Sequence, residues 1–359
     1  MSRNALAGLG RISVYAFKGH MDIQFIHQPD QFGQLQPAWD ALVERSATNV
    51  PFLRHSYLQH WWSTLGGGEW DEGELWIAVG RVEGRVRGIA PLFRTRSSEN
   101  EHRLMFLGSI EISDYLDVIA APDDVDVFSG HLLDALSRQR SDDWQVLDLY
   151  NLPDASPSRR ALAIASRERG WGVAESTLQP CPAVVLPSSW EDYLAGLEKK
   201  YRHEIRRKLR RAGEIGLTFQ VAENRDAFKE SLEGMLALMR TDVRKAAFLQ
   251  PAMETQFRRS MRSAFDEGWL QLAMLKADGI LAAAYLNFDD QGKLWVYNSA
   301  INPEFFSASA GWVLLAHLIR WGIEHDRSEL DFMRGDEPYK YRFGGVDRAI
   351  FRLRIQRPA

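Results

Sequence analysis

Residues 270–298 read LQLAMLKADGILAAAYLNFDDQGKLWVYN, and the apolar pattern of this stretch predicts the fold. Two apolar runs, Leu270–Met274 and Ala282–Leu286, lie on either side of a turn at Asp278-Gly279. Short apolar runs joined by a glycine-containing turn are typical of a β-hairpin. The next run, Leu294–Asn298, predicts a third strand, so we expect an antiparallel sheet here.

The same order of elements is expected a second time, earlier in the chain. Strands at Leu75–Val79 and Gly88–Leu92 flank a turn at Glu83-Gly84, and Leu104–Gly108 predicts the strand that follows. In both halves an amphipathic helix and a further strand come next. The helices are expected over about 127–140 and 311–325, and the strands over 145–149 and 329–332. The sequence therefore predicts an α+β fold of two similar domains, with mixed, mostly antiparallel sheets flanked by helices.

Length and composition agree with two globular domains. The chain has 359 residues, and a domain usually has roughly 100–200. Its 44 basic and 48 acidic side chains give a formal charge of −4, which argues against a dedicated nucleic-acid binder, and we expect no DNA partner. No stretch of 18 apolar residues occurs, so no membrane-spanning helix is expected, and the cytoplasm is the default location.

The boundary between the domains is expected near residue 186. Prolines flank the short apolar run Ala183–Leu186, which suits an edge strand or a linker. We expect a disordered tail over residues 1–20, which lack the apolar core of a cleaved signal, and domains over 21–186 and 187–359.

The sequence contains no recognisable metal site. Its single cysteine, Cys181, lies between two prolines and excludes an internal disulfide; a structural thiol is the preferred interpretation over a nucleophile. The nine histidines lack paired spacing, and structural roles are expected for His55, His60 and His317.

A strongly basic helix is predicted to open the second half. Apolar residues from Trp190 to Leu209 recur at steps of three or four, with Ser188 or Ser189 as the N-cap and Gly213 or Gly216 at the end. Residues 198–211 hold eight basic and two acidic side chains, a net +6. This face is either an anion site, for a phosphate, a polyanionic substrate or RNA, or a solvated helix surface.

Two further segments carry groups that could bind a ligand or take part in catalysis. The small-residue loop 307–311 enters a helix, so its free backbone N–H groups suit a phosphate, although a serine-rich N-cap looks the same. It is neither a Walker A loop nor a dinucleotide-binding glycine motif. Residues 330–345 combine acidic, basic and aromatic groups, which suit a catalytic site or an ordinary edge hairpin. Their alternation predicts Tyr339, Tyr341 and Phe343 on one face, with Lys340 and Arg342 on the other.

Residues 331–344, DFMRGDEPYKYRFG, resemble the terminal motif of GNAT-superfamily acetyltransferases of the CelD-like type, which are relatives of the Fem-type peptidoglycan aminoacyltransferases. The resemblance extends to residues 270–286, 309–311, 202–211 and 113–117, and it covers about 50–350. It implies two tandem GNAT-like domains that transfer an acyl, by preference acetyl, group from acyl-CoA to an amine or hydroxyl. The family's Ser-Pro-Gly loop is Ser309-Ala310-Gly311 here, and the loss of proline removes a rigid element.

The resemblance also implies roles for individual residues. The donor pyrophosphate would bind the backbone of Ser309, Ala310 and Gly311, and the strand with Tyr297 and Asn298 would pair with the pantetheine amides. Candidates for the base are Asp114, Asp331 and Asp336, and the candidate acid is Tyr339. The candidates for binding substrate are Tyr115, Arg206, Arg334, Lys340 and Arg342.

Two alternatives remain open at this point. Fem-type relatives use aminoacyl-tRNA, and the basic helix suits that donor, but the helices expected at about 226–246 and 251–267 look too short for the long helical hairpin of such relatives. The other alternative is a catalytically inactive scaffold in polysaccharide biosynthesis, because residues 151–154 of the first half, Asn-Leu-Pro-Asp, replace Arg334–Glu337. The acceptor would be a small molecule, a sugar or a cell-envelope precursor.

Overall fold

The second half of the chain forms the sheet that the sequence predicts. In the computed structural model, which describes residues 20–97 and 99–358, the strand order of this sheet is β10-β15-β14-β13-β12-β11. Its strands are β10 (Ala183–Val185), β11 (Thr218–Val221), β12 (Leu270–Ala277), β13 (Ile280–Asp290), β14 (Lys293–Ile301) and β15 (Glu329–Asp331). The β12–β13 hairpin turns at Asp278 and Gly279, which have φ angles of 48° and 79°, as a tight hairpin turn requires.

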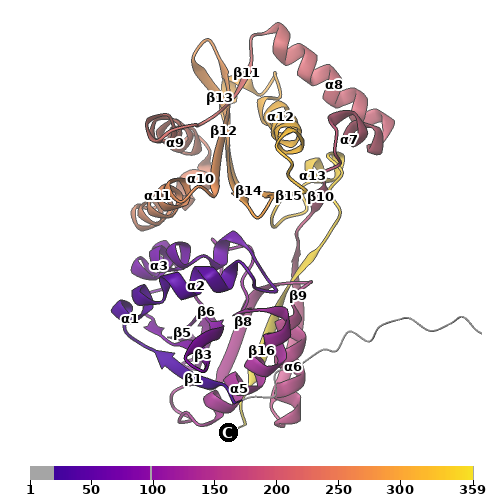
Figure 1. Cartoon of the computed structure of the whole chain (residues 1–359). Coiled ribbons are helices and arrows are strands. Elements are labelled where there is room, and N and C mark those ends of the chain that lie inside the picture. Colours follow the sequence, from indigo (N-terminus) through magenta and orange to yellow (C-terminus); the bar gives the residue numbers. More distant parts are fainter. Residues whose placement is uncertain (1–19, 98, 359) are drawn as a thin grey trace, which may run out of the picture.

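The first half carries two sheets, with orders β1-β3-β4-β7 and β2-β5-β6-β8-β16-β9. The hairpin prediction is confirmed by β3 and β4. The strands are β1 (Asp22–Ile26), β2 (Glu74–Leu75), β3 (Ile77–Val82), β4 (Arg85–Ala90), β5 (Leu92–Arg96), β6 (His102–Phe106), β7 (Ile119–Ala120), β8 (Val146–Pro153), β9 (Gly172–Pro180) and β16 (Ala349–Gln356). The chain thus has the α+β fold predicted, with both halves containing mixed sheets flanked by helices (Figure 1).

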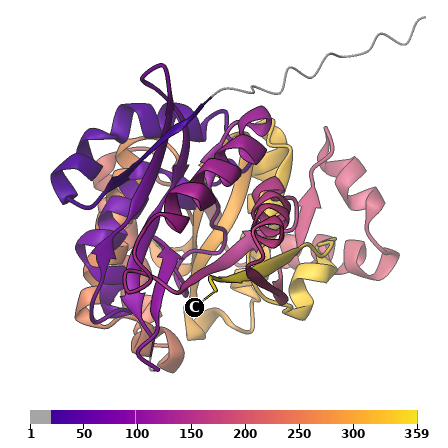
Figure 2. The ribbon, with the colours of Figure 1, turned by 90° about the horizontal axis from the view of Figure 1, so that it is seen from below.

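The last strand, β16, lies in the first half, which the expected boundary of 187–359 does not anticipate. It pairs antiparallel with both β8 and β9, and the yellow end of the chain therefore crosses back over the molecule (Figures 1 and 2). Its side chains Ile350, Leu353 and Ile355 are buried in the first core, and a register shift near Phe351 brings Ile350 to the same face as the other two. A strand pattern predicts pairing but not the sheet that supplies the partner, because period-two alternation is the same in either sheet. The expected tail lies almost wholly outside the described residues.

Helices cover the sheets and connect the two halves. Their bounds are α1 (Pro29–Gln34), α2 (Gln36–Val43), α3 (His55–Ser63), α4 (Leu65–Gly68), α5 (Val125–Ser137), α6 (Pro157–Glu168), α7 (Trp190–Gly196), α8 (Lys199–Glu214), α9 (Arg225–Met239), α10 (Val243–Phe248), α11 (Pro251–Asp266), α12 (Ala310–Glu324) and α13 (Pro338–Arg342). Within the described residues, no helix combines the length and apolarity needed to cross a bilayer.

Two local predictions are wrong. The single basic helix is two helices, because Leu197 is extended (φ −82°, ψ 154°) and Arg202 donates to the carbonyls of Leu194 and Ala195 at the end of α7. The predicted N-cap Ser189 does accept from Asp192. Residues 338–342 form the helix α13 instead of a strand, since a proline at the first helical position favours a helix start.

The halves pack on one another through α3 and α11. Ser56 donates to Glu267 (3.0 Å), and the His60 ring bonds to Ser263 (2.7 Å). Arg54 pairs with Asp290 in the same interface. One hydrophobic cluster continues from the first half into the second, so the two halves share a core.

Candidate functional site

The strand β15 pairs with only the first part of β14. Their parallel ladder joins Lys293–Trp295 to Glu329–Asp331, and β14 then continues without β15 to Ile301. On its other side, β14 pairs with β13 through a β-bulge that leaves Tyr297 without a register partner. An opening is therefore created where β15 ends, beside the bulge.

The part of β14 beyond the bulge has a free edge. Asn302 donates its backbone N–H to Ala282 of β13 (2.9 Å). Since bonded pairs alternate along an antiparallel ladder, Ala300 faces β13, whereas Ser299 and Ile301 direct their N–H and C=O groups away from it. The Ser299 N–H donates to Asn298 Oδ1 (2.8 Å) and the Ser299 carbonyl accepts from the Lys245 ammonium. This edge can therefore accept an extended ligand as an additional strand once these two side chains move away.

A polar pocket of about 210 Å³ lies at the opening. It joins residues of the first half, of α10, of the sheet and of the C-terminal motif. They are Asp114, Lys245, Tyr285, Val296, Tyr297, Asn298, Ser299, Phe332, Met333, Arg334, Glu337, Tyr339 and Lys340. Six of the residues proposed from the sequence thus meet here, although they come from three separated segments.

Asp114 and Arg334 form the link between the halves at this pocket. Arg334 Nε donates to Asp114 Oδ1 (2.6 Å), and the Arg334 backbone N–H donates to Oδ2 (3.2 Å). The rest of the guanidinium donates to the carbonyls of Ile110 and Glu111. The side chains are only 13% and 14% exposed. With both carboxylate oxygens occupied, Asp114 is suited to hold Arg334 in place.

Asp331 lies behind this pair, in an almost fully buried position. Its carboxylate accepts from the Tyr115 hydroxyl (2.9 and 3.1 Å) and from the Met333 backbone N–H (2.7 Å). Burial raises the pKa of Asp331 to about 7, although these hydrogen bonds act in the opposite direction. Asp331 and Tyr115 line a second pocket of about 270 Å³, which lies between the halves and is walled mainly by apolar side chains such as Trp295.

Tyr339 and Lys340 differ in what they offer to a ligand. Tyr339 lines the polar pocket, and burial raises the pKa of its phenol to about 12. The Lys340 ammonium donates to the carbonyls of Met333 (3.2 Å), Arg334 (2.7 Å) and Gly335 (3.1 Å), and pairs with Glu337 (2.9 Å). Its donors are thus used within the chain, so it organises the loop 333–337.

Three of the proposed catalytic and substrate-binding residues lie away from both pockets. Asp336 is exposed on the loop. Arg206 of α8 pairs with Glu191 of α7 (2.7 Å), and the Arg342 guanidinium lies 6.0 Å from the centre of the Trp312 ring. In a helix α13, Arg342 follows Lys340 by about 200° around the axis, so the two side chains diverge.

The loop at 309–311 lies at the far end of β14. Ser309 is the residue before α12 and has a left-handed φ of 57°, and its hydroxyl makes no capping hydrogen bond within the described chain. A Cβ on Gly311 would lie 2.5 Å from Ile301 Cδ1 and 3.1 Å from Ile301 Cγ1, so a larger residue here would require the Ile301 side chain to move. The first turn of α12 therefore follows directly on from the free edge of β14.

The pocket also contains residues that the sequence reasoning missed, among them Lys245, Tyr285 and Glu337. Glu337 lies inside the motif and could have been chosen with Asp336. No sequence signal marks Lys245, because α10 reaches the pocket only in the folded chain.

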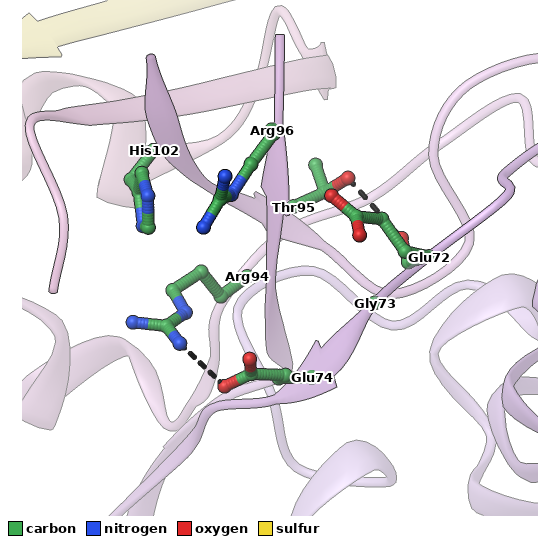
Figure 3. Close-up of a pocket in the computed structure, with 7 residues that line it drawn as sticks. All are labelled: Glu72, Gly73, Glu74, Arg94, Thr95, Arg96 and His102. Atoms are coloured by element: carbon green, nitrogen blue, oxygen red, sulfur yellow. Dashed lines mark hydrogen bonds and ion pairs between the residues drawn. The ribbon is translucent and has the colours of Figure 1, made fainter. Parts of the chain in front are cut away.

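Another polar hollow, of about 220 Å³, lies in the first half beside β5 (Figure 3). Arg94, Arg96 and His102 point into it, and Arg94 pairs with Glu74 (2.7 Å). It shares no residue with the polar pocket. Within the described residues, no group of three or more His, Cys, Asp or Glu side chains could hold a metal ion.

The comparisons with known proteins agree with this geometry. The family model described as an acetyltransferase (GNAT) domain matches residues 199–341. The structure is similar to FemX (TM-score 0.63, 12% identity, 92% of this chain and 96% of FemX). It is also similar to L-PGS from Bacillus licheniformis, with a TM-score of 0.54, 13% identity, and 88% of this chain and 90% of that chain covered. A third similar structure is the C-terminal DUF2156 domain of a protein assigned as a lysylphosphatidylglycerol synthetase from Agrobacterium fabrum, with a TM-score of 0.55, 12% identity and 92% of each chain covered.

No curated protein sequence matches this one. At these identities the solved structures establish the fold, while the family match covers the part of the chain that contains the free edge of β14 and most of the terminal motif, up to residue 341. Residues 199–341 therefore match the family described as an acetyltransferase (GNAT) domain, and the overall fold of the chain is similar to that of FemX.

Proposed function

We propose that this protein transfers an acyl group from acyl-CoA to an amine or hydroxyl of a small-molecule, sugar or cell-envelope acceptor. The observation that carries this proposal is the free edge of β14, which opens onto a polar pocket at its bulge and leads to the start of α12 at its other end. The amides of pantetheine would pair with the outward groups of Ser299 and Ile301. The Ser309 N–H already donates to the Phe306 carbonyl (2.9 Å), so the backbone N–H groups of Ala310 and Gly311 would bind the pyrophosphate.

In this arrangement the thioester lies beside Tyr297 and Asn298, and direct transfer needs a base and an acid. Asp331 is the preferred base, because a carboxylate with a pKa near 7 accepts a proton readily at neutral pH. The acceptor would enter through the 270 Å³ pocket, lose its N–H or O–H proton to Asp331 and attack the thioester carbonyl. The C–S bond then breaks, and the Tyr339 phenol, protonated at neutral pH, donates to the leaving sulfur.

Ligand-induced stabilisation tests the donor. A ligand at about 100 times its Kd stabilises the folded state by about 2.7 kcal/mol, enough to raise the melting temperature measurably. We expect acetyl-CoA or a longer acyl-CoA to do so, and free pantetheine to do so only weakly. If no acyl-CoA changes the melting temperature, an acyl-CoA donor is excluded.

A second candidate donor is aminoacyl-tRNA, and the charge of α8 favours it. Lys199, His203, Arg207 and Arg211 follow one another at four-residue spacing, a repeat of about 6 Å along the helix. All four are exposed, and the three cations form no ion pair with the described residues. Their repulsion across turns costs stability that a phosphate backbone would offset. Steeply salt-dependent binding of charged tRNA would support this donor, and unchanged mobility at low salt would exclude it.

A further inference from the structure

Glu69 of the first half directly follows a run of three glycines in α4. The glycines 66–68 have left-handed φ angles of 66°, 74° and 88°. A Cβ on Gly67 would lie 2.7 Å from the Met253 Cα of α11, so a side chain at this position would meet the backbone of the second half. The segment that carries Glu69 is therefore packed directly on α11.

The Glu69 carboxylate binds the backbone of the loop that follows β6. Its Oε1 atom accepts the N–H of Ile110 and the N–H of Glu111 (3.0 Å). Its Oε2 atom is buried and makes no hydrogen bond within the described residues. Burial raises the pKa of Glu69, although the two N–H groups and the charge of Arg334 act in the opposite direction. The hydrogen bonds of this carboxylate thus both go to one loop.

Arg334 of the terminal motif binds the same peptide group from its other end. The peptide group between Ile110 and Glu111 donates its N–H to Glu69 and accepts from Arg334 Nη1 at its carbonyl (3.2 Å). A carboxylate at the N–H and a guanidinium at the C=O polarise the group in the same sense, and hydrogen bonds chained in this way strengthen one another. One peptide group therefore links Glu69 to Arg334.

The loop also contacts the strand β14 beside the bulge. The Tyr297 hydroxyl donates to the Ile112 carbonyl (3.0 Å), one residue beyond Glu111. Tyr297 and Arg334 both line the polar pocket. A displacement of the peptide group that Glu69 holds would thus shift the partners of both side chains, so two walls of the pocket depend on one loop.

From these contacts we infer that Glu69 is a positioning residue for the transfer reaction, because it holds the peptide group 110–111 that sets Arg334 and Tyr297 at the polar pocket. The inference rests on the proposed function, which places the thioester beside Tyr297. Glu69 itself touches no reacting atom. Since α11 fixes the glycines 66–68, the second half sets part of its own site through a residue of the first half.

Turnover of acetyl-CoA, with glucosamine as a probe acceptor that offers both an amine and hydroxyls, tests this role. Glu69→Ala should lower kcat about 10–100-fold with little change in the KM for acetyl-CoA, because the site is misplaced while the edge of β14 stays intact. Glu69→Gln keeps the acceptor oxygen and should retain most of the activity. Asp40→Ala is the matched control, since Asp40 is a half-buried carboxylate that accepts the His55 N–H (3.0 Å), and it should leave kcat unchanged.

A second pair of variants tests the packing that fixes Glu69. Gly67→Ala places a methyl against the backbone of α11 and should reproduce the loss of kcat seen in Glu69→Ala. Gly84→Ala is its control, because Gly84 has a similar φ of 77° and no atom lies within 4 Å of the added methyl. It should keep the kcat of the wild type.

Hydrogen–deuterium exchange of residues 108–116 gives a readout that needs no turnover. Exchange should become faster in Glu69→Ala and Gly67→Ala and stay unchanged in Asp40→Ala. Unchanged exchange in Glu69→Ala would show that Glu69 does not hold the loop, and faster exchange with an undiminished kcat would show that the loop does not set the site; either result overturns the inference. A wild type that neither binds nor turns over any acyl-CoA overturns the proposed function instead, and the exchange result then decides separately whether Glu69 holds the loop.

Discussion

Arg334 of the second half and Asp114 of the first half form an ion pair of 2.6 Å at the wall of the polar pocket. The two residues are 220 positions apart in the chain. Because the pair is mostly buried and carries additional bonds to the backbone on each side, it couples the position of the terminal motif to that of the first half. The candidate site is therefore a property of both halves.

Removal of this pair should destabilise the chain. Arg334→Ala leaves a largely buried carboxylate without its partner, which typically costs about 3–5 kcal/mol. Urea unfolding measures the change. The exposed pair Arg320–Glu324 is the matched control, and Arg320→Ala should cost about 0–1 kcal/mol. Equal losses for the two variants would contradict the structural role of Arg334.

Activity should depend on the ionisation of Asp331. If the carboxylate is the base, kcat rises with pH through about 7 and falls about 10²–10⁴-fold in Asp331→Asn. The Tyr115 hydrogen bond lowers the pKa of Asp331, so Tyr115→Phe should move this limb of the profile to higher pH. The pH–rate profile measures both effects. Asp336→Asn, at an exposed position, serves as the control, and an identical loss there would argue against Asp331.

The same carboxyl should make stability fall as pH rises. Its pKa is raised in the folded state, so between about pH 4 and 7 the folded protein holds a proton that the unfolded chain releases. The wild type should therefore lose stability relative to Asp331→Asn across this range and hold a constant difference above it. Urea midpoints at pH 4.5, 6 and 8 measure the trend, and a difference that grows in the opposite direction would contradict the burial argument.

Tyr339→Phe should lower kcat without weakening the binding of acyl-CoA. Loss of one preorganised donor to a leaving group typically costs about 10²–10³-fold in rate. Single-turnover kinetics and titration separate the two quantities. Tyr341→Phe is the control, because the Tyr341 hydroxyl donates to Asp347 on the exposed side of α13. An unchanged kcat in Tyr339→Phe would remove this residue from the mechanism.

Gly311→Ala should disturb the start of α12 through a clash. The added methyl would lie 2.5 Å from Ile301 Cδ1, and such overpacking costs about 1–3 kcal/mol. We expect Gly311→Ala to weaken acyl-CoA binding and to lower the free energy of unfolding. In the double variant, Ile301→Ala should partly restore the binding affinity and the stability, because it removes the atoms that clash. Gly213→Ala, where no atom lies within 4 Å of the new methyl, should be neutral or stabilising. If Gly311→Ala changed neither the acyl-CoA affinity nor the stability, that result would contradict the tight packing of α12 on β14.

Much of the site could be predicted from the sequence because several of its residues lie close together in one motif. Asp331, Arg334 and Tyr339 lie within nine positions, and the structure places all three around the opening beside β14. The role of Lys340 could not be foreseen, because charge alone does not tell whether an ammonium meets a ligand or the chain's own carbonyls. The same limit applies to Arg206 and Arg342, which suited an anion by type but lie elsewhere.

The sequence by itself determined the local elements, since the period of the apolar residues and the turn glycines specify β12–β13 and α12 without outside help. Tertiary structure alone decided that β16 completes the sheet of the first half, that Asp114 meets Arg334, and that Lys245 covers the free edge of β14. The physical reason is that periodicity records which face of an element is buried, whereas the partner on that face depends on contacts between segments that can be some 200 residues apart.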